Sequence, residues 1–172
     1  KKFMAGLHEK IEWGEARDAR DGLEFCGRNC VQNQEMDHIK VSMTGYAAKL
    51  ETVPMTKERR KEEEASLNKT EFSQLCGLGG QVTWLGRQGN PRLSFRSSRL
   101  ATCYGDPKVK DLKEANSVIR LANKLGGGCA LEFRGDVDIE NCVVLGVQDA
   151  SFDNLPNNAS QGGQMLLLAD PR

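Results

Sequence analysis

The sequence predicts an α+β fold, with short strands at both ends of the chain and helices between them. Short runs of apolar or alternating residues at 23–42 and 130–169 are typical of strands. Apolar residues recur at helical spacing in the middle of the chain, most clearly between Leu112 and Leu125. We therefore expect an N-terminal β-hairpin, three helical segments and a C-terminal group of strands.

The composition limits which kinds of partner the protein can bind and whether it can be a membrane or secreted protein. The 172 residues suffice for one domain or parts of two. Lys+Arg and Asp+Glu both number 24, so any contact with nucleic acid must come from a local basic patch. The modest apolar content of 38%, with only 6% aromatic residues, predicts a modest core. No apolar run is long enough for a membrane span or for the core of a signal peptide.

The six cysteines favour reduced thiols in an intracellular protein over a zinc site. They form no CxxC pair. Cys26 and Cys30 are separated by three residues, but His8 and His38 supply no second pair at a zinc-like spacing.

The first 54 residues are predicted to be a charged lead-in, a hairpin and a short helix. Residues 1–22 are partly helical or poorly ordered in this interpretation, with Trp13 as the residue that attaches them to the rest. Strands are expected at 23–31 and 38–42, with three side chains facing the core. A helix begins at Tyr46 and ends at Val53-Pro54. The three core-facing side chains are Phe25, Ile39 and Val41.

The next helix has a start signal and a glycine-rich face. Asn68 and Glu71 have the spacing of a capping box, after a charge run at 57–64 that is more typical of a solvated segment than of a phosphate-binding patch. An apolar series at helical spacing then runs from Phe72 to Leu85. Because glycine lowers helix propensity, the glycines at 77, 79 and 80 predict that another backbone packs closely there.

A second start signal and a candidate basic patch follow. Asn90 is a good N-cap residue, and Pro91 is favoured at the first helical position. On a helix that begins at Pro91, three arginines would share one face. That face could contact phosphates or could simply be solvated, and the sequence leaves both interpretations open. The candidate residues are Arg87, Arg92, Arg96 and Arg99.

The clearest helix opens at Asp106-Pro107, carries an apolar stripe from Leu112 to Leu125, and ends at three glycines, 126–128. A strand at 130–134 and a turn at 136–141 follow. Val143–Val147 then predicts a strand covered on both faces, with Asp149 at its far end. A connection at 154–163 leads to a second apolar strand at 164–169. Asp149 could be a metal ligand, but spacing alone favours a carboxylate that caps the turn with Ser151.

Four short motifs, collinear in the chain, resemble the Pol polyprotein of copia-type retrotransposons. The chain is similar to the C-terminal part of the reverse transcriptase (residues 1–54), its helical thumb and connection (55–127), and the start of ribonuclease H (128–172). Asn90 and Arg92 depart from the family pattern, which suggests a lost ion pair and a degenerate copy. The motifs are Phe25-Cys26-Gly27-Arg28, residues 78–88 with 90–95, residues 111–116, and Asp149-Ala150-Ser151-Phe152 with Ser160-Gln161-Gly162-Gly163.

This resemblance implies a partial C-terminal ribonuclease H-like sheet in which Asp149 is the first Mg²⁺-binding acid. The paired polymerase acids and the later nuclease acids are expected outside this chain, so the chain would be an inactive fragment. The complete enzyme would join nucleotides and cut the RNA of an RNA–DNA hybrid. The four arginines would contact template-primer phosphates. The alternative is a non-catalytic structural or interaction subunit, with a protein partner over the edge of the C-terminal hairpin.

Overall fold

The computed structural model describes residues 18–126, 130–136, 139–155 and 159–169. The segment 1–17, including Trp13 and His8, lies outside the described residues. The chain divides into two units, residues 1–133 and 134–172. Both helices and sheets are present, so the α+β expectation is confirmed at that level. The expected divisions after residues 54 and 127 remain predictions.

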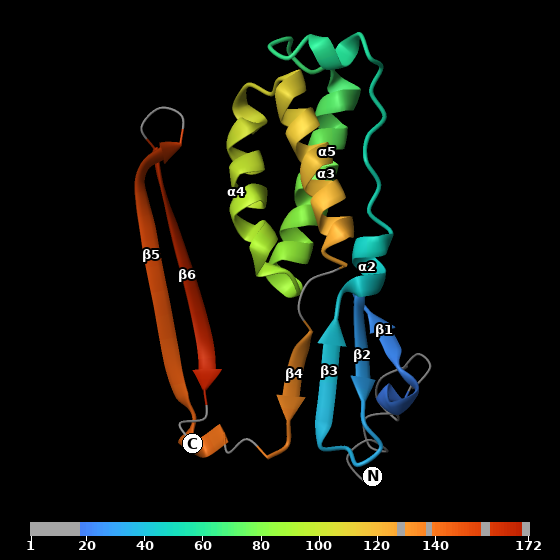
Figure 1. Cartoon of the computed structure of the whole chain (residues 1–172), viewed down its shortest axis with the longest axis vertical. Coiled ribbons are helices and arrows are strands. Elements are labelled where there is room, and N and C mark those ends of the chain that lie inside the picture. Colours follow the sequence, from blue (N-terminus) through green and yellow to red (C-terminus); the bar gives the residue numbers. More distant parts are fainter. Residues whose placement is uncertain (1–17, 127–129, 137–138, 156–158, 170–172) are drawn as a thin grey trace, which may run out of the picture. The chain divides into compact units, whose positions relative to one another are not determined.

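The first unit contains a four-stranded sheet in the order β1-β2-β3-β4 (Figure 1). Its strands are β1 (Leu23–Phe25), β2 (Arg28–Gln32), β3 (His38–Ser42) and β4 (Leu131–Arg134). The first three are antiparallel neighbours. The prediction of one strand over 23–31 is wrong, because the chain reverses at Cys26 and Gly27, whose φ angles are 50° and 76°. The strands at 38–42 and 131–134 are confirmed.

The expected core role of the strand side chains is also wrong for two of them. Phe25 is 64% exposed and Ile39 is 36% exposed, while Val41 is half-buried. Phe25 ends the three-residue strand β1, pairs with Arg28 across the tight turn, and keeps most of its side chain exposed there. The core is therefore formed mainly by helices.

Four helices carry most of that core: α2 (Thr44–Ala48), α3 (Lys69–Gln88), α4 (Ser94–Thr102) and α5 (Val109–Lys124). In Figure 1, α3, α4 and α5 lie side by side, and residues of α3 contact both other helices. Their fully buried apolar side chains include Leu75, Val82, Leu85, Leu100, Leu112, Val118 and Ile119. Burial of this kind stabilises a fold by about 25 cal/mol per Å² of apolar surface.

The capping box of α3 is confirmed. Asn68 Oδ1 accepts from the Glu71 amide at 2.9 Å, and Glu71 Oε2 accepts from the Asn68 amide at 2.9 Å. The reason proposed for the glycines is wrong. A side-chain atom, Tyr104 Oη, fills the space where a Cβ on Gly79 would lie, whereas a Cβ on Gly77 or Gly80 would meet no described atom of another element within 4 Å.

Asn90 does not cap the next helix with its side chain. Pro91 begins a 3-10 turn, Pro91–Leu93, as its preference for the first helical position predicts. The Asn90 side chain is instead fully buried, and neither its Nδ2 nor its Oδ1 has a hydrogen-bond partner among the described residues. Its backbone makes the turn, since its amide donates to Leu85 O and its carbonyl accepts from Leu93 N.

The predicted apolar stripe of α5 is confirmed, but the helix begins at Val109 and not at Asp106-Pro107, and glycines 127 and 128 lie outside the described residues. Leu112, Ala115, Ile119 and Ala122 are fully buried, and Asp111 accepts the Lys108 amide at 2.7 Å at the helix start. Gly126 follows the helix with φ 60°, the left-handed conformation that glycine adopts without strain. Among the helices that the structure describes, none is long and apolar enough to cross a membrane.

The segment 49–68 runs along α5 and is held there by polar contacts. Asn116 on α5 accepts from Val53 N at 2.7 Å and donates to Val53 O at 2.9 Å, so both polar backbone groups of Val53 are hydrogen-bonded. Acids of the charge run pair with α5 lysines, as in Glu64–Lys110 at 2.9 Å. The run is therefore largely a solvated, paired segment, as its composition indicates.

The second unit is a long antiparallel hairpin of β5 (Val143–Leu155) and β6 (Ala159–Ala169). The sequence predicts this hairpin, but the structure corrects three of its details. The pairing continues through Asp149↔Gly163 to Ser151↔Gln161, so Asp149 lies within β5, and the supposed connection at 154–163 is mostly strand. Val143–Val147 is not covered on both faces: Val144 is 69% exposed and Val147 is 58% exposed. An apolar run such as Val143–Val147 is typical of a strand that other elements cover on both faces. The described residues of this unit include no such covering elements.

Candidate functional site

A groove of about 410 Å³ lies between α3 and α4. Small residues of α3 leave it open, and aromatic, basic and amide side chains border it. The Tyr104 ring lies over Gly79 and packs edge-on against Phe72, with ring centroids 6.3 Å apart. The described lining residues are Cys76, Gly79, Gly80, Thr83, Trp84, Arg87, Gln88, Ala101 and Tyr104.

One side of this groove is tied to the β1–β2 turn through Arg28. The Arg28 guanidinium carbon lies 5.6 Å from the centroid of the Trp84 ring, within the range of a cation–π contact. Arg28 Nη2 also donates a hydrogen bond to Gln88 Oε1. Trp84 and Gln88 are one turn apart on α3, so one guanidinium contacts two lining residues.

The predicted basic residues are distributed over three elements. Arg87 lies on α3 and lines the groove, Arg92 lies in the 3-10 turn, and Arg96 and Arg99 lie one turn apart on α4. Arg87, Arg92 and Arg99 are exposed. The Arg96 guanidinium is 3.7 Å from the Glu114 carboxylate of α5. The stretch from Pro91 is a 3-10 turn followed by α4, so the expected single helical face begins only at Ser94.

Neither the phenol of Tyr104, which lines the groove, nor the thiol of Cys103, which precedes it in the chain, is activated as a nucleophile. Burial raises the pKa of the Cys103 thiol, and the neighbouring Asp111 raises it further. Burial likewise raises the pKa of Tyr104. A raised pKa keeps both groups protonated near neutral pH, whereas a reactive cysteine needs a lowered one.

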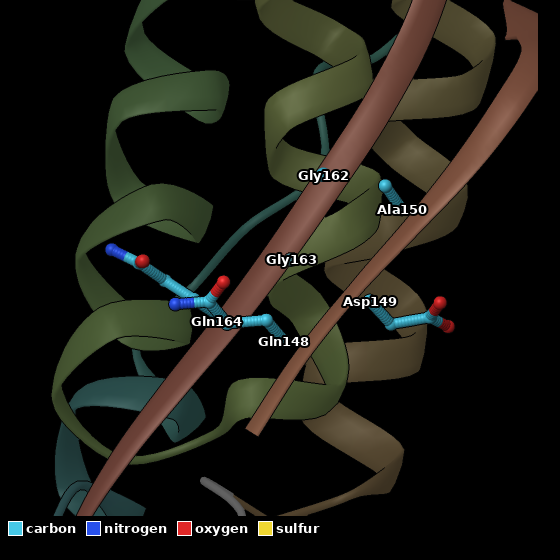
Figure 2. A pocket seen from close by; sticks show the side chains of 6 residues that line it. All are labelled: Gln148, Asp149, Ala150, Gly162, Gly163 and Gln164. Atoms are coloured by element: carbon cyan, nitrogen blue, oxygen red, sulfur yellow. The ribbon is translucent and has the colours of Figure 1, made fainter. Parts of the chain in front are cut away.

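Asp149 lies in the second unit, on an open stretch of the hairpin. Figure 2 shows its carboxylate on one side of the ribbon and the amides of Gln148 and Gln164 on the other. Gly163 lies directly opposite Asp149, so the cross-strand neighbour adds no side chain beside the carboxylate. A shallow depression here is lined by Gln148, Asp149, Ala150, Gly162, Gly163 and Gln164.

An exposed carboxylate of this kind is a suitable oxygen ligand for Mg²⁺. Among the described residues, however, no group of three or more His, Cys, Asp or Glu side chains is close enough to hold a metal ion. In the part of the chain that is described, Asp149 thus offers a single carboxylate toward a metal site. The four arginines belong to the first unit, and Asp149 belongs to the second.

Sequence reasoning missed the groove and its aromatic border. Trp84, Arg87 and Gln88 share a helix face at spacings of three and four residues, next to the glycines at 79 and 80. That pattern could have indicated an open helix face. The contribution of Arg28, 56 positions before Trp84 in the chain, has no local signal.

Comparisons with models of known protein families, with curated proteins and with solved structures find no match for this chain.

Proposed function

We propose that the chain is the C-terminal part of a copia-type reverse transcriptase that continues into the first hairpin of ribonuclease H. In this proposal it binds an RNA–DNA hybrid or template-primer within an intracellular retroelement enzyme. It is inactive by itself, because the other catalytic acids lie elsewhere. The chain comes from a copy of the element whose pattern has drifted at Asn90 and Arg92.

The observation that supports the proposal best is the β5–β6 hairpin. A two-stranded ribbon is marginal in water unless further strands or helices cover it. Here Val144, Leu166 and Leu168 on one face are 63–69% exposed, and Leu145 and Leu167 on the other are 44–48% exposed. A hairpin apolar on both faces, with an acid inside its first strand, suits the beginning of a larger two-sided sheet such as that of ribonuclease H.

The first unit supports the nucleic-acid part of the proposal. Arg87, Arg92 and Arg99 have exposed side chains, and Arg87 borders a groove that also contains the Trp84 ring. Arginine contacts phosphates, and aromatic rings pack against bases and sugars of nucleic acids. With a net charge of zero for the whole chain, this local basic surface would carry the electrostatic part of binding.

The test is binding of the full chain to an RNA–DNA hybrid at several KCl concentrations. We expect affinity to fall steeply with salt. The double variant Arg96→Glu/Arg99→Glu should weaken binding and lower the salt slope by about 0.9 for each phosphate that the protein no longer neutralises. The matched control is Arg120→Glu/Lys124→Glu, which reverses two charges one turn apart on α5. Equal effects of both pairs, or no binding by the wild type, would contradict the nucleic-acid proposal.

A second assay addresses Asp149 and Mg²⁺. The chain alone, given MgCl2 and a hybrid labelled in its RNA strand, is expected to release no RNA product. Cleavage that Asp149→Asn abolishes would show that this chain holds a complete site and would overturn the proposal that it is inactive by itself.

The alternative is a structural subunit whose hairpin binds a protein partner. The exposed apolar side chains of Leu166 and Leu168 favour it, because contiguous exposed apolar surface marks interaction sites. The variant Leu166→Ser/Leu168→Ser should then lose a stoichiometric partner from the native source while hybrid binding stays unchanged. Failure to bind hybrid, together with such a partner, would favour this function over the first.

A further inference from the structure

The amide of Gln88 has a defined orientation because its neighbour can only donate. A guanidinium has five N–H donors and no acceptor, so the atom of Gln88 that faces Arg28 is the carbonyl oxygen Oε1. The amide nitrogen, which carries two donors, is then on the side away from Arg28. Since Gln88 lines the groove, this orientation determines which hydrogen-bonding group the groove presents.

Arg28 is itself held in place by a tight turn. Cys26 and Gly27 have positive φ angles and place Arg28 at the start of β2. The turn packs closely on α2, because a Cβ on Gly27 would lie 2.8 Å from Tyr46 Cδ2. On the next residue, Asn29 Oδ1 accepts from the Gly45 amide at 3.3 Å. The β1–β2 turn and α2 therefore fix the backbone from which Arg28 extends.

The Arg28 guanidinium makes two contacts at once, and both depend on its planar shape. It lies over the Trp84 ring while one edge donates to Gln88 Oε1. A planar fork can stack and donate in its own plane at the same time, whereas a lysine ammonium is a point charge. Of the described residues that line the groove, two are partners of Arg28, and Arg28 is not one of the lining residues.

We infer that Arg28 is a positioning residue for the groove between α3 and α4: it holds the Trp84 ring and directs the Gln88 amide nitrogen toward a bound nucleic-acid strand. This inference rests on the proposed nucleic-acid function and adds a specific chemistry to it. The strand segment in the groove presents a hydrogen-bond acceptor to Gln88, a flat or apolar surface to Trp84, and a phosphate to Arg87. Arg28 contributes through Trp84 and Gln88 and not by contact with the strand.

The experiment measures hybrid affinity and its salt slope for the full chain in a Trp13→Phe background, where Trp84 is the single tryptophan and its fluorescence reports binding. We expect Arg28→Met to weaken binding about tenfold without changing the salt slope. Arg28→Lys keeps the charge but should weaken binding to a similar extent. Arg120→Met, which removes one exposed positive charge from α5, is the control and should change neither quantity.

A double-mutant cycle with Gln88→Met isolates the positioning role. If Arg28 acts through Gln88, the loss in the double variant is clearly smaller than the product of the two single losses. Circular dichroism shows whether each variant keeps its helices. If Arg28→Met does not fold, Arg28→Lys takes its place in the cycle.

Two results would overturn the inference while leaving nucleic-acid binding intact. In the first, Arg28→Met lowers the salt dependence of hybrid affinity by a slope of about 0.9, and Arg28→Lys restores it. That result would identify a direct contact between Arg28 and a phosphate. The other is independent effects of Arg28 and Gln88, or no effect of Arg28 at all. Absence of hybrid binding by the wild type is a different result, because it removes the proposed function itself.

Discussion

Arg59 and Glu71 form a bidentate ion pair that joins the segment 49–68 to the start of α3. Arg59 Nε donates to Glu71 Oε1 at 2.8 Å, and Arg59 Nη2 donates to Glu71 Oε2 at 2.7 Å. Glu71 is also the second half of the capping box with Asn68. One carboxylate therefore caps a helix and holds the preceding chain, and the ion pair with Arg59 requires it to be charged.

The first prediction concerns acid stability. The Arg59 hydrogen bonds, and then the Asn68 amide, lower the pKa of Glu71 below its ordinary value of 4.5. A carboxylate whose pKa is lower in the folded state stabilises the fold fully above its unfolded pKa, and this stabilisation is lost as the pH falls through the folded pKa. Glu71→Gln should thus lower the thermal midpoint at pH 7, and the difference from wild type should shrink as the pH falls below 4.5. A difference independent of pH would contradict this account.

Removal of the N-cap side chain gives the second prediction. Asn68→Ala deletes the acceptor of the Glu71 amide and should lower the free energy of unfolding by about 1 kcal/mol, measured by urea denaturation. Asn68→Asp and Asn68→Ser keep an acceptor at this position and serve as controls. Equal stability of Asn68→Ala and these controls would show that the cap contributes nothing.

The third prediction compares two glycines of the same helix. Gly77 is exposed and a Cβ there meets no described atom within 4 Å, so Gly77→Ala should stabilise the protein by about 1 kcal/mol. A Cβ on Gly79 would overlap Tyr104 Oη, so Gly79→Ala must displace that side chain and should cost about 1–3 kcal/mol.

Tyr104→Phe tests whether this overlap is the cause. It removes Oη and leaves Cζ, 3.3 Å from the added Cβ, as the nearest atom. Thermal denaturation of Gly79→Ala, Tyr104→Phe and the double variant should show that most of the Gly79→Ala cost is recovered. Additive losses would place the cause elsewhere in the helix.

Two buried asparagines provide the fourth prediction. Asn90 is fully buried with both polar side-chain atoms unpartnered among the described residues, whereas Asn116 is 5% exposed and bonds both polar groups of Val53. Asn90→Leu removes an unsatisfied amide and should raise the free energy of unfolding by about 1 kcal/mol. Asn116→Leu leaves the Val53 groups unpaired and should lower it by about 1–3 kcal/mol. A loss of stability in both variants would indicate that Asn90 has a partner, such as a buried water.

Local signals in the sequence anticipated much of the helical part. The Asn68–Glu71 spacing located the start of α3, the stripe from Leu112 to Ala122 defined the buried face of α5, and Gly126 marked its end. Each signal depends on residues within one or two turns, so it needs no knowledge of the fold. The hairpin of β5 and β6 was predicted for the same reason, from two neighbouring apolar runs.

The sequence by itself thus determined the α+β class, the helices α3 and α5, and a C-terminal hairpin that contains Asp149. Only the tertiary structure decided that Phe25 lies outside the core, that Tyr104 fills the space at Gly79, and that Asn90 is buried without a partner among the described residues. It also decided that Arg28 meets Trp84 and Gln88. The physical reason is range: caps and periodicity act between near neighbours in the chain, whereas burial and long-range contacts depend on which elements pack together.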